Sequence, residues 1–301
     1  MIGQDWATPR FALPPLAPRT GPFPHRAFLE SWWATCTDTD DDLLLVENAD
    51  ALLPLWRRGE TIRFCGDADL TDYHSPLGPG TIDTFVEAAR TWSGYVVDLD
   101  SLPGEASNVL SAALARAGVA TTPEHHATAA VLTLPASLET WLGSIGKKQR
   151  HEIRRKRRRF TDAVGAPTIE RRDDPAALQT FFAMHRRAAG PKGDFLTPRR
   201  EAFFTELHAN AGATVDLLLG DGDPVAAAFG FEDRSGYYLY NSAYDPAAGH
   251  ASPGIVMLAL QIEDQIRRGA EVFDFLKGDE VYKYRLGAVE RPLFRLRGRL
   301  P

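Results

Sequence analysis

The segment from residue 252 to residue 287 constrains the fold most, because it combines a helix, a buried strand and a polar loop. It opens on Ser-Pro-Gly, which suits a helix start, and apolar residues then recur at helical spacing until Gly269 ends the helix. The next run, 272–276, is apolar except for Asp274, as expected for a buried strand. A helix that leads directly into a buried strand predicts an α/β or α+β fold.

The polar residues that follow this strand are the first candidates for a reaction site. Residues 277–284 read Lys-Gly-Asp-Glu-Val-Tyr-Lys-Tyr. Ionisable groups at the end of a buried strand of an α/β sheet are where binding and reaction sites are commonly found.

The chain is long enough for two folded units. Its 301 residues can bury two ordinary cores. A short repeat of strand, acidic turn and strand occurs at 43–56 and again at 217–230. We therefore predict an α/β (α+β) fold of two tandem units, residues 1–135 and 136–301. Each unit is expected to hold a mixed, mostly antiparallel sheet flanked by helices.

Composition limits the classes of partner and the compartment. A net charge of −6 argues against a general nucleic-acid coat, so anion binding must come from a local patch. The two cysteines, Cys36 and Cys65, have no neighbouring set of Cys and His that predicts a metal site or a disulfide framework, so we expect a cytoplasmic protein. The Pro-rich residues 1–26 lack a signal-peptide core, and no apolar run approaches the roughly 18 residues that span a bilayer.

Four stretches occur in an order that resembles a known family. They are the basic run 147–159, GDPVAAAFGF at 222–231, the Ser-Pro-Gly helix start, and VFDFLKGDEVYKYRLG at 272–287. This order resembles the GNAT-superfamily acetyltransferases described as CelD-like or BioF2-like, which are relatives of the FemABX peptidyltransferases. The resemblance covers residues 140–290 well. The first half resembles the family only loosely, through PFPHRAFLESWW and TDYHSPL.

The resemblance implies two tandem GNAT-like units and acyl transfer to an amine, with acyl-CoA or aminoacyl-tRNA as the donor. The chain departs from the general GNAT pattern at the loop that binds pyrophosphate. That loop is usually Arg/Gln-x-x-Gly-x-Gly/Ala, whereas residues 249–254 read Gly-His-Ala-Ser-Pro-Gly. The second glycine and the helix start remain, but the compact spacing is absent.

The start of the 252–269 helix is the predicted donor site. Gly254, Ile255 and Val256 offer free backbone N–H groups there, and Ser252 can cap the same turn. A helix N-terminus carries about half a positive charge and binds phosphate. The alternative interpretation is an ordinary helix start with no ligand.

The basic helix is the strongest anomaly of composition. Residues 147–160 contain nine Lys or Arg and one Glu. Cations in the first turn oppose the helix dipole at a cost of up to about 1 kcal/mol each, and the run 154–159 places like charges at i,i+4. We expect phosphates of CoA, phosphates of tRNA or acidic side chains to compensate, and we assign Lys147 and Arg154 to donor binding. The absence of interleaved aromatic residues disfavours RNA, so CoA or a structural role ranks above tRNA.

Acyl transfer to an amine requires a base, a proton donor and stabilisation of the developing charge. Asp279 or Glu280 is the predicted base, directly or through water, and Tyr282 or Tyr284 the proton donor. Lys277 or Lys283 is expected to hold an anion. The alternative is a surface turn in which Glu280 and Lys283 simply pair, contributing about 0.2–0.5 kcal/mol. We favour catalytic roles for Glu280, Tyr282, Asp279 and Lys283.

Two further stretches are candidates for substrate binding. The strand GYYLYNSAY carries Tyr240 and Asn241, and the loop TDYHS carries Asp72, Tyr73 and His74. In GNAT-like folds the strands equivalent to the first stretch open as a V around the acyl group, and the second could line an acceptor pocket. Packing for the tyrosines and surface exposure for the histidine are the alternatives.

Three functions are compatible with these features. The leading hypothesis is an N-acyltransferase that moves an acyl group from acyl-CoA, with acetyl-CoA preferred, to an amine of a small molecule or peptide. The second is a FemABX-like transferase that uses aminoacyl-tRNA, and the third is a non-catalytic protein that binds RNA or a partner. No metal and no membrane contact are predicted, and the acceptor and oligomeric state stay open.

Overall fold

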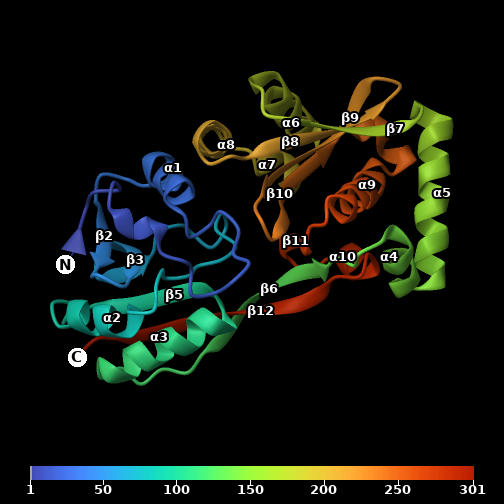
Figure 1. The fold of residues 1–301 in the computed structure, drawn as a ribbon. Helices are drawn as coiled ribbons and strands as arrows, with labels where there is room; N and C mark the ends of the chain where they lie inside the picture. The colour runs from blue at the N-terminus through green and yellow to red at the C-terminus, as the bar shows by residue number, and fades with distance from the viewer. Residues whose placement is uncertain (1) are drawn as a thin grey trace. The chain divides into compact units, whose positions relative to one another are not determined.

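The computed structural model describes residues 2–301, which form two compact units (Figure 1). The N-terminal unit runs to Ala129 and also includes 291–301, and the C-terminal unit comprises 130–290. The boundary predicted near residue 135 assigns residues 291–301 to the second unit. In the structure these residues belong to the first unit. The reason is a strand pairing: β12 (Val289–Arg299) is antiparallel to β5 (Val96–Pro103).

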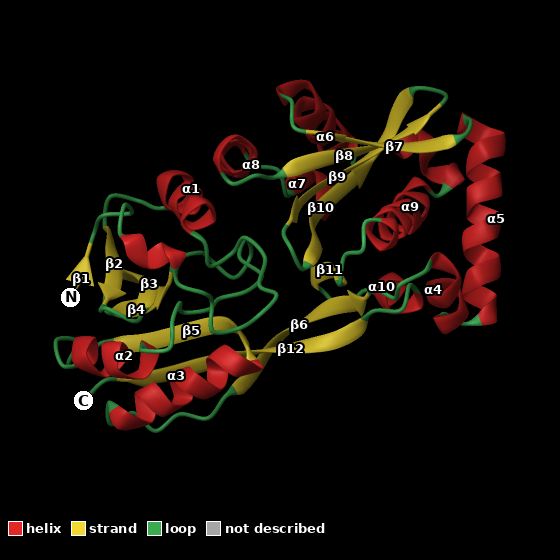
Figure 2. Cartoon of the chain, in the orientation of Figure 1, coloured by secondary structure: helices red, strands yellow, loops and turns green. Residues whose placement is uncertain are grey.

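The N-terminal unit is a mixed sheet with helices packed against it (Figure 2). Phe85 and Leu110, on two of its helices, are fully buried in one core with Leu53 and Leu99 of the strands. Its remaining elements are β1 (Ile2–Gly3), η1 (Pro9–Ala12), α1 (Arg26–Cys36), β2 (Asp41–Glu47), β3 (Leu52–Arg58), β4 (Thr61–Phe64), α2 (Thr81–Ala89) and α3 (Gly104–Arg116). The strand order is β1-β2-β3-β4-β5-β12, in which only β4 and β5 are parallel.

The C-terminal unit is a second mixed sheet. Its elements are the part of β6 (Glu124–Thr133) from residue 130 on, α4 (Leu138–Ser144), α5 (Lys147–Val164), β7 (Pro167–Arg172), α6 (Pro175–Arg187), α7 (Pro191–Asp194), α8 (Pro198–Asn210), β8 (Thr214–Gly220), β9 (Asp223–Glu232), β10 (Gly236–Tyr244), η2 (Pro246–Ala251), α9 (Pro253–Arg267), β11 (Val272–Lys277) and α10 (Val281–Arg285). The order is β6-β11-β10-β9-β8-β7, with β10 and β11 parallel and β7 to β10 antiparallel. The predicted α/β fold class is confirmed.

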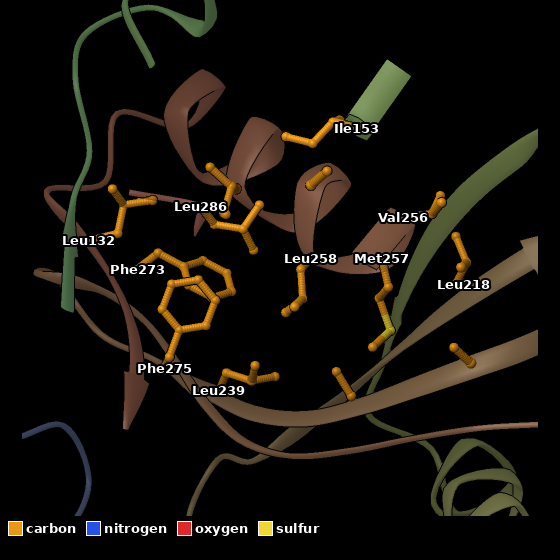
Figure 3. Close-up of a cluster of buried hydrophobic side chains, with 14 of the residues drawn as sticks. Leu132, Ile153, Leu218, Leu239, Val256, Met257, Leu258, Phe273, Phe275 and Leu286 are labelled. Atoms are coloured by element: carbon orange, nitrogen blue, oxygen red, sulfur yellow. The ribbon is translucent and has the colours of Figure 1, made fainter. Parts of the chain in front are cut away.

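Helices cover both faces of this second sheet. On one face α9 lies between the sheet and α5 (Figure 1), and its apolar residues pack with Phe273, Phe275 and Leu239 (Figure 3). On the other face Phe181 of α6 and Phe204 of α8 pack against Phe229 of β9. Alternate residues along a strand point to opposite faces, so each strand serves two cores.

Two features of β10 and β11 shape the space beside α9. Their pairing runs only from Gly236–Val272 to Tyr238–Asp274, so the second half of each strand is not matched to the other. A register shift between Leu239 and Asn241 marks a bulge in β10 at the same level. None of the helices described between residues 2 and 301 combines the length and the apolarity needed to cross a lipid bilayer.

Trp141 of α4 anchors the end of α10, and its replacement tests that anchor. Its indole is fully buried and donates a hydrogen bond of 2.9 Å to the Leu286 carbonyl. We expect Trp141→Phe to lower the free energy of unfolding by about 1–3 kcal/mol, because the buried carbonyl loses its donor. Chemical denaturation of the full chain measures this. Trp33→Phe is the control, because the half-buried Trp33 indole donates to no protein group in residues 2–301. If both variants lost the same free energy of unfolding, the hydrogen bond from Trp141 to Leu286 would not be what stabilises the end of α10.

Candidate active site

Two adjoining cavities open in the C-terminal unit, each of about 340 Å³. The first, called here the α9 cavity, lies at the start of α9 and is lined there by Ser252, Gly254 and Ile255. The second, the α5 cavity, lies between α5 and α10. Lys156, Ile255 and Tyr282 line both, so the two cavities adjoin, and together they are called the cleft here.

The start of α9 presents an electropositive surface to the α9 cavity. Ser252 adopts a left-handed conformation, with φ of 58°, and its side chain caps no backbone N–H. Instead its hydroxyl accepts a hydrogen bond from Arg159 of α5, so a guanidinium lies beside the helix N-terminus. A β-carbon added at Gly254 would meet no atom within 4 Å, so the space beside this residue is open. The prediction of a free N–H at Val256 is wrong, because this N–H donates to the Ser252 carbonyl at 3.3 Å and the residue is 1% exposed.

The cations of α5 are compensated in several different ways. Arg157 pairs with Glu263 of α9 at 2.6 Å, and Arg155 pairs with Glu152 at 2.7 Å. Arg150 donates to the carbonyls of Leu142, Gly143 and Ile145 at the end of α4. Acidic side chains and backbone carbonyls therefore neutralise part of the helix.

The two residues of α5 that were predicted to bind the acyl donor do not lie in the cavity walls. Lys147 and Arg154 are exposed, and neither lines the α9 or the α5 cavity. Lys148 and Lys156 line the cleft instead, and Arg285 of α10 joins them. Residues 148, 152 and 156 are spaced at i,i+4 and so share one stripe of the helix. That spacing is visible in the sequence, but the side of α5 that packs on α9 is not.

The loop after β11 is organised by the ammonium group of Lys283. This side chain is 2% exposed, and its Nζ donates to the carbonyls of Leu276, Lys277 and Gly278 at 3.3, 2.7 and 3.1 Å. It also lies 2.9 Å from a carboxylate oxygen of Glu280. Positive φ angles at Leu276 (58°) and Gly278 (110°) turn these carbonyls toward one point. The Lys283 donors are therefore engaged within the loop.

The two predicted bases differ from the predicted proton donors in exposure. Asp279 is exposed, and the Glu280 side chain is 55% exposed. Burial, followed by the charge of Glu280, raises the pKa of Tyr282 to about 12. Burial also raises the pKa of Tyr284, whose hydroxyl oxygen is enclosed and has no hydrogen-bond partner within residues 2–301. Both phenols are therefore protonated at neutral pH, and Tyr282 is the one that lines the cleft.

Tyr240 and Asn241 lie on the face of the sheet opposite α9. The Tyr240 ring packs 5.3 Å from Phe204 of α8, and the Asn241 side-chain oxygen lies 2.8 Å from Nε2 of His185 on α6. The next residue, Ser242, lines the α9 cavity together with Tyr244. The bulge in β10 changes which side chains point to each face, and the sequence carries no signal for it.

Asp72, Tyr73 and His74 belong to the N-terminal unit. Tyr73 is fully buried under the Arg291 guanidinium, 4.8 Å from the ring centre. His74 is 4% exposed, stacks on Phe64, and has Nδ1 2.9 Å from the Asp100 carbonyl oxygen. Asp72 is half-buried. Among the described residues, no three His, Cys, Asp or Glu side chains are grouped to hold a metal ion.

Comparison with known proteins places this site in a family. Residues 147–284 match the family model described as acetyltransferase (GNAT) domain. This part of the chain is therefore a GNAT domain, which confirms the resemblance predicted from the sequence. No curated protein sequence matches the chain.

Three solved structures share the fold over nearly the whole chain. A conserved protein of unknown function from Bacteroides thetaiotaomicron has a TM-score of 0.64 at 16% identity, covering 99% of this chain and 100% of that one. FemX has a TM-score of 0.62 at 13% identity, covering 95% and 93%. The C-terminal domain of a putative lysylphosphatidylglycerol synthetase from Agrobacterium fabrum has a TM-score of 0.57 at 14% identity, covering 90% of each. At these identities the likeness concerns the fold alone.

The turn after β11 requires glycine at position 278, which a substitution can test. A β-carbon there would combine strain at φ of 110° with a clash against the Glu280 carboxylate, which could move away only by giving up its ion pair with Lys283. Gly222 has φ of 92° but no atom within 4 Å of an added β-carbon. We expect Gly222→Ala to cost about 1–2 kcal/mol from backbone strain alone and Gly278→Ala to cost more. Thermal unfolding compares the two variants, and equal losses would remove the steric argument.

Proposed function

We propose that this protein is an N-acyltransferase that takes an acyl group from acyl-CoA, with acetyl-CoA as the expected donor, and transfers it to an amine of a small molecule or peptide. The observation that carries the proposal is the α9 cavity. It joins the free N–H groups at the start of α9 to the protonated phenol of Tyr282 within one cleft. The two free cysteines, Cys36 and Cys65, suit the reducing cytoplasm in which we place the enzyme.

The diphosphate of the donor is assigned to the start of α9. The N–H groups of Gly254 and Ile255, the Ser252 hydroxyl and the helix dipole all favour an anion there. Arg159 beside Ser252 and Lys156 on the cavity wall add two positive charges. The altered spacing of the 249–254 loop is then compensated by side chains from α5.

The acyl group is assigned to the space where β10 and β11 stop pairing. An amine nitrogen attacks the thioester carbonyl there, a C–N bond forms, the C–S bond breaks and CoA leaves as a thiolate. The amine proton passes through water to Glu280 or Asp279, which are both exposed. The Tyr282 hydroxyl donates a hydrogen bond to the departing thiolate, which takes its proton from the phenol or from solvent.

Lys283 has a positioning role in this scheme. Its ammonium is used by three loop carbonyls and by Glu280, so it holds the turn that carries Glu280 and Tyr282. We leave Lys147 and Arg154 out of the donor site, because both lie outside the cleft walls. We keep as proposals a role for Asp72, Tyr73 and His74 in acceptor binding and a role for Tyr240 and Asn241 beside the acyl group.

Binding of acetyl-CoA tests the donor assignment. We expect calorimetry to detect binding and Arg159→Glu to weaken it at least about tenfold, because an anion faces a reversed charge at the α9 N-terminus. Arg234→Glu is the matched control, since Arg234 is exposed in the β9–β10 turn and lines neither cavity. Failure of acetyl-CoA and longer acyl-CoAs to bind would refute the proposal.

Tyr282→Phe tests the proton donor. We expect kcat for release of free CoA from acetyl-CoA, assayed with a panel of amines and peptides, to fall by about 10²-fold or more with little change in KM. Because the pKa of Tyr282 is about 12, the native phenol keeps its proton throughout the ordinary assay range. An ordinary tyrosine would begin to lose its proton near pH 10, but Tyr282 does not. Any fall in rate that the wild type shows up to about pH 10 must then come from another group, and we expect the Tyr282→Phe variant to show the same fall. A variant of full activity would exclude Tyr282 from the reaction and favour a non-catalytic role.

A FemABX-like transfer from aminoacyl-tRNA is the second candidate. The observation in its favour is the exposed cations on α5, of which Arg154 and Arg158 have no ion pair in the described part of the chain. This function predicts tRNA binding that weakens steeply with salt and is lost when Arg154, Arg155 and Arg158 are changed to Glu. Equal binding by the wild type and the triple variant would discard it.

A further inference from the structure

The N-terminal unit repeats the order of elements that builds the cleft in the C-terminal unit. Its strands β2, β3 and β4 form an antiparallel meander, α2 follows, and β5 then pairs parallel to β4. The elements β8, β9, β10, α9 and β11 have the same order and the same strand directions. The sequence repeat at 43–56 and 217–230 lies in this shared meander. Each unit therefore has one pair of parallel strands that is joined through a helix.

In both units the parallel strands separate after a short pairing. β4 and β5 pair only at Thr61–Val96 and Ile62–Val97, and β5 then continues to Pro103 without β4. The two strand ends also share a backbone turn, because Ser101 near the end of β5 has φ of 56° and Leu276 of β11 has φ of 58°. Buried carbonyl groups at such a strand end need donors. In the C-terminal unit Lys283, which follows β11, supplies them.

In the N-terminal unit the donors come from the connector between β4 and α2, residues 65–80. The backbone N–H of His74 donates to the Ser101 carbonyl at 2.9 Å, and its Nδ1–H donates to the Asp100 carbonyl at 2.9 Å. The imidazole also stacks on Phe64 of β4, with the ring centres 5.5 Å apart. One residue of the connector thus bridges β4 and β5 where their own pairing has stopped.

The connector is part of the folded core of its unit. Residues 73–78 are all buried, whereas several residues of the shorter connector 245–252 are exposed. Two backbone hydrogen bonds of 2.9 Å join Leu77 to Leu52 of β3. Gly78, with φ of 81°, lies so close to Asp50 that an added β-carbon would overlap the Asp50 carbonyl oxygen. The chain therefore fixes this connector along its length, with His74 at the strand opening.

The start of α2 also differs from the start of α9 in charge. The first turn of α2 carries Asp83, whereas the first turn of α9 has no acidic residue and Arg159 contacts its cap. The N–H of Gly80, at the cap of α2, donates to the Asp50 carbonyl at 3.1 Å, and Thr81 is fully buried. A carboxylate in the first turn occupies the position that the helix dipole would offer to a phosphate. The start of α2 is thus unsuited to a polyanionic ligand.

We propose that the connector 65–80 is a built-in plug, which fills the strand opening of the N-terminal unit and is anchored there by His74. The chain then binds a single acyl donor, at α9, although it contains two units of the same design. This inference rests on the proposed acyltransferase function, because it concerns where the donor binds. An anchoring role for His74 leaves the half-buried Asp72 of the same connector available to an acceptor.

The number of donor molecules bound per chain tests the plug. We expect calorimetric titration of the full chain with acetyl-CoA to show a single site, which Arg159→Glu weakens at least about tenfold. Asp83→Arg makes the opposite reversal of charge at the start of α2 and should change the Kd by less than about twofold. Asp83 is exposed, and its pair with the exposed Arg116 contributes little to stability, so this variant is expected to fold.

The outcomes separate the plug from the proposed function. Two donor sites per chain would overturn the plug and leave the transferase function in place. A single site that Asp83→Arg tightens and Arg159→Glu leaves unchanged would do the same, because it would place the donor at α2. Failure of acetyl-CoA and of every longer acyl-CoA to bind would remove both.

Amide hydrogen exchange of the wild-type chain tests the anchor without a substitution. We expect the peptide spanning 73–78 to exchange slowly, and at the same rate with saturating acetyl-CoA, because the amides of His74 and Leu77 are bonded within the core. The peptide spanning 246–251 is the comparison within the chain, and it should exchange faster and become slower when acetyl-CoA binds at α9. Rapid exchange of 73–78, or a response to acetyl-CoA equal to that of 246–251, would overturn the plug.

Discussion

The loop that follows β11 depends on one buried ammonium group. Lys283 brings three successive backbone carbonyls and the Glu280 carboxylate to a single point. Without a cation there, the converging oxygens would repel one another and nothing would balance the backbone strain of the positive φ at Leu276. The loop sets where α10 begins, and α10 carries Tyr282 and Arg285 into the cleft.

The opposite wall of the cleft depends on how α5 packs across α9. The apolar seam of α5 is thin, with Ile153 and Phe160 as its buried residues, so polar contacts contribute to its docking. The ion pair of Arg157 with Glu263 and the hydrogen bond from Arg159 to Ser252 join it directly to α9. A helix that is costly in isolation, because its cations oppose one another, thereby acquires partners in the folded unit.

The division of the sheet into two faces separates the candidate residues. The cleft lies on the α9 side, together with Tyr282, Gly254 and Ser252. Asn241 and His185 meet on the α6 side, where the bulge in β10 turns Asn241 away from the cleft.

The sequence by itself determined the fold class, the family of residues 147–284 and the helix–strand–loop order of 252–287, because apolar periodicity and local turn residues are encoded over short distances. Only the tertiary structure decided which side of α5 faces α9, and hence that Lys148 and Lys156 line the cleft while Lys147 and Arg154 do not. It alone placed residues 291–301 with the first unit and buried Lys283 within its own loop. These outcomes arise from contacts between residues far apart in the chain or from backbone turns, and local periodicity specifies neither.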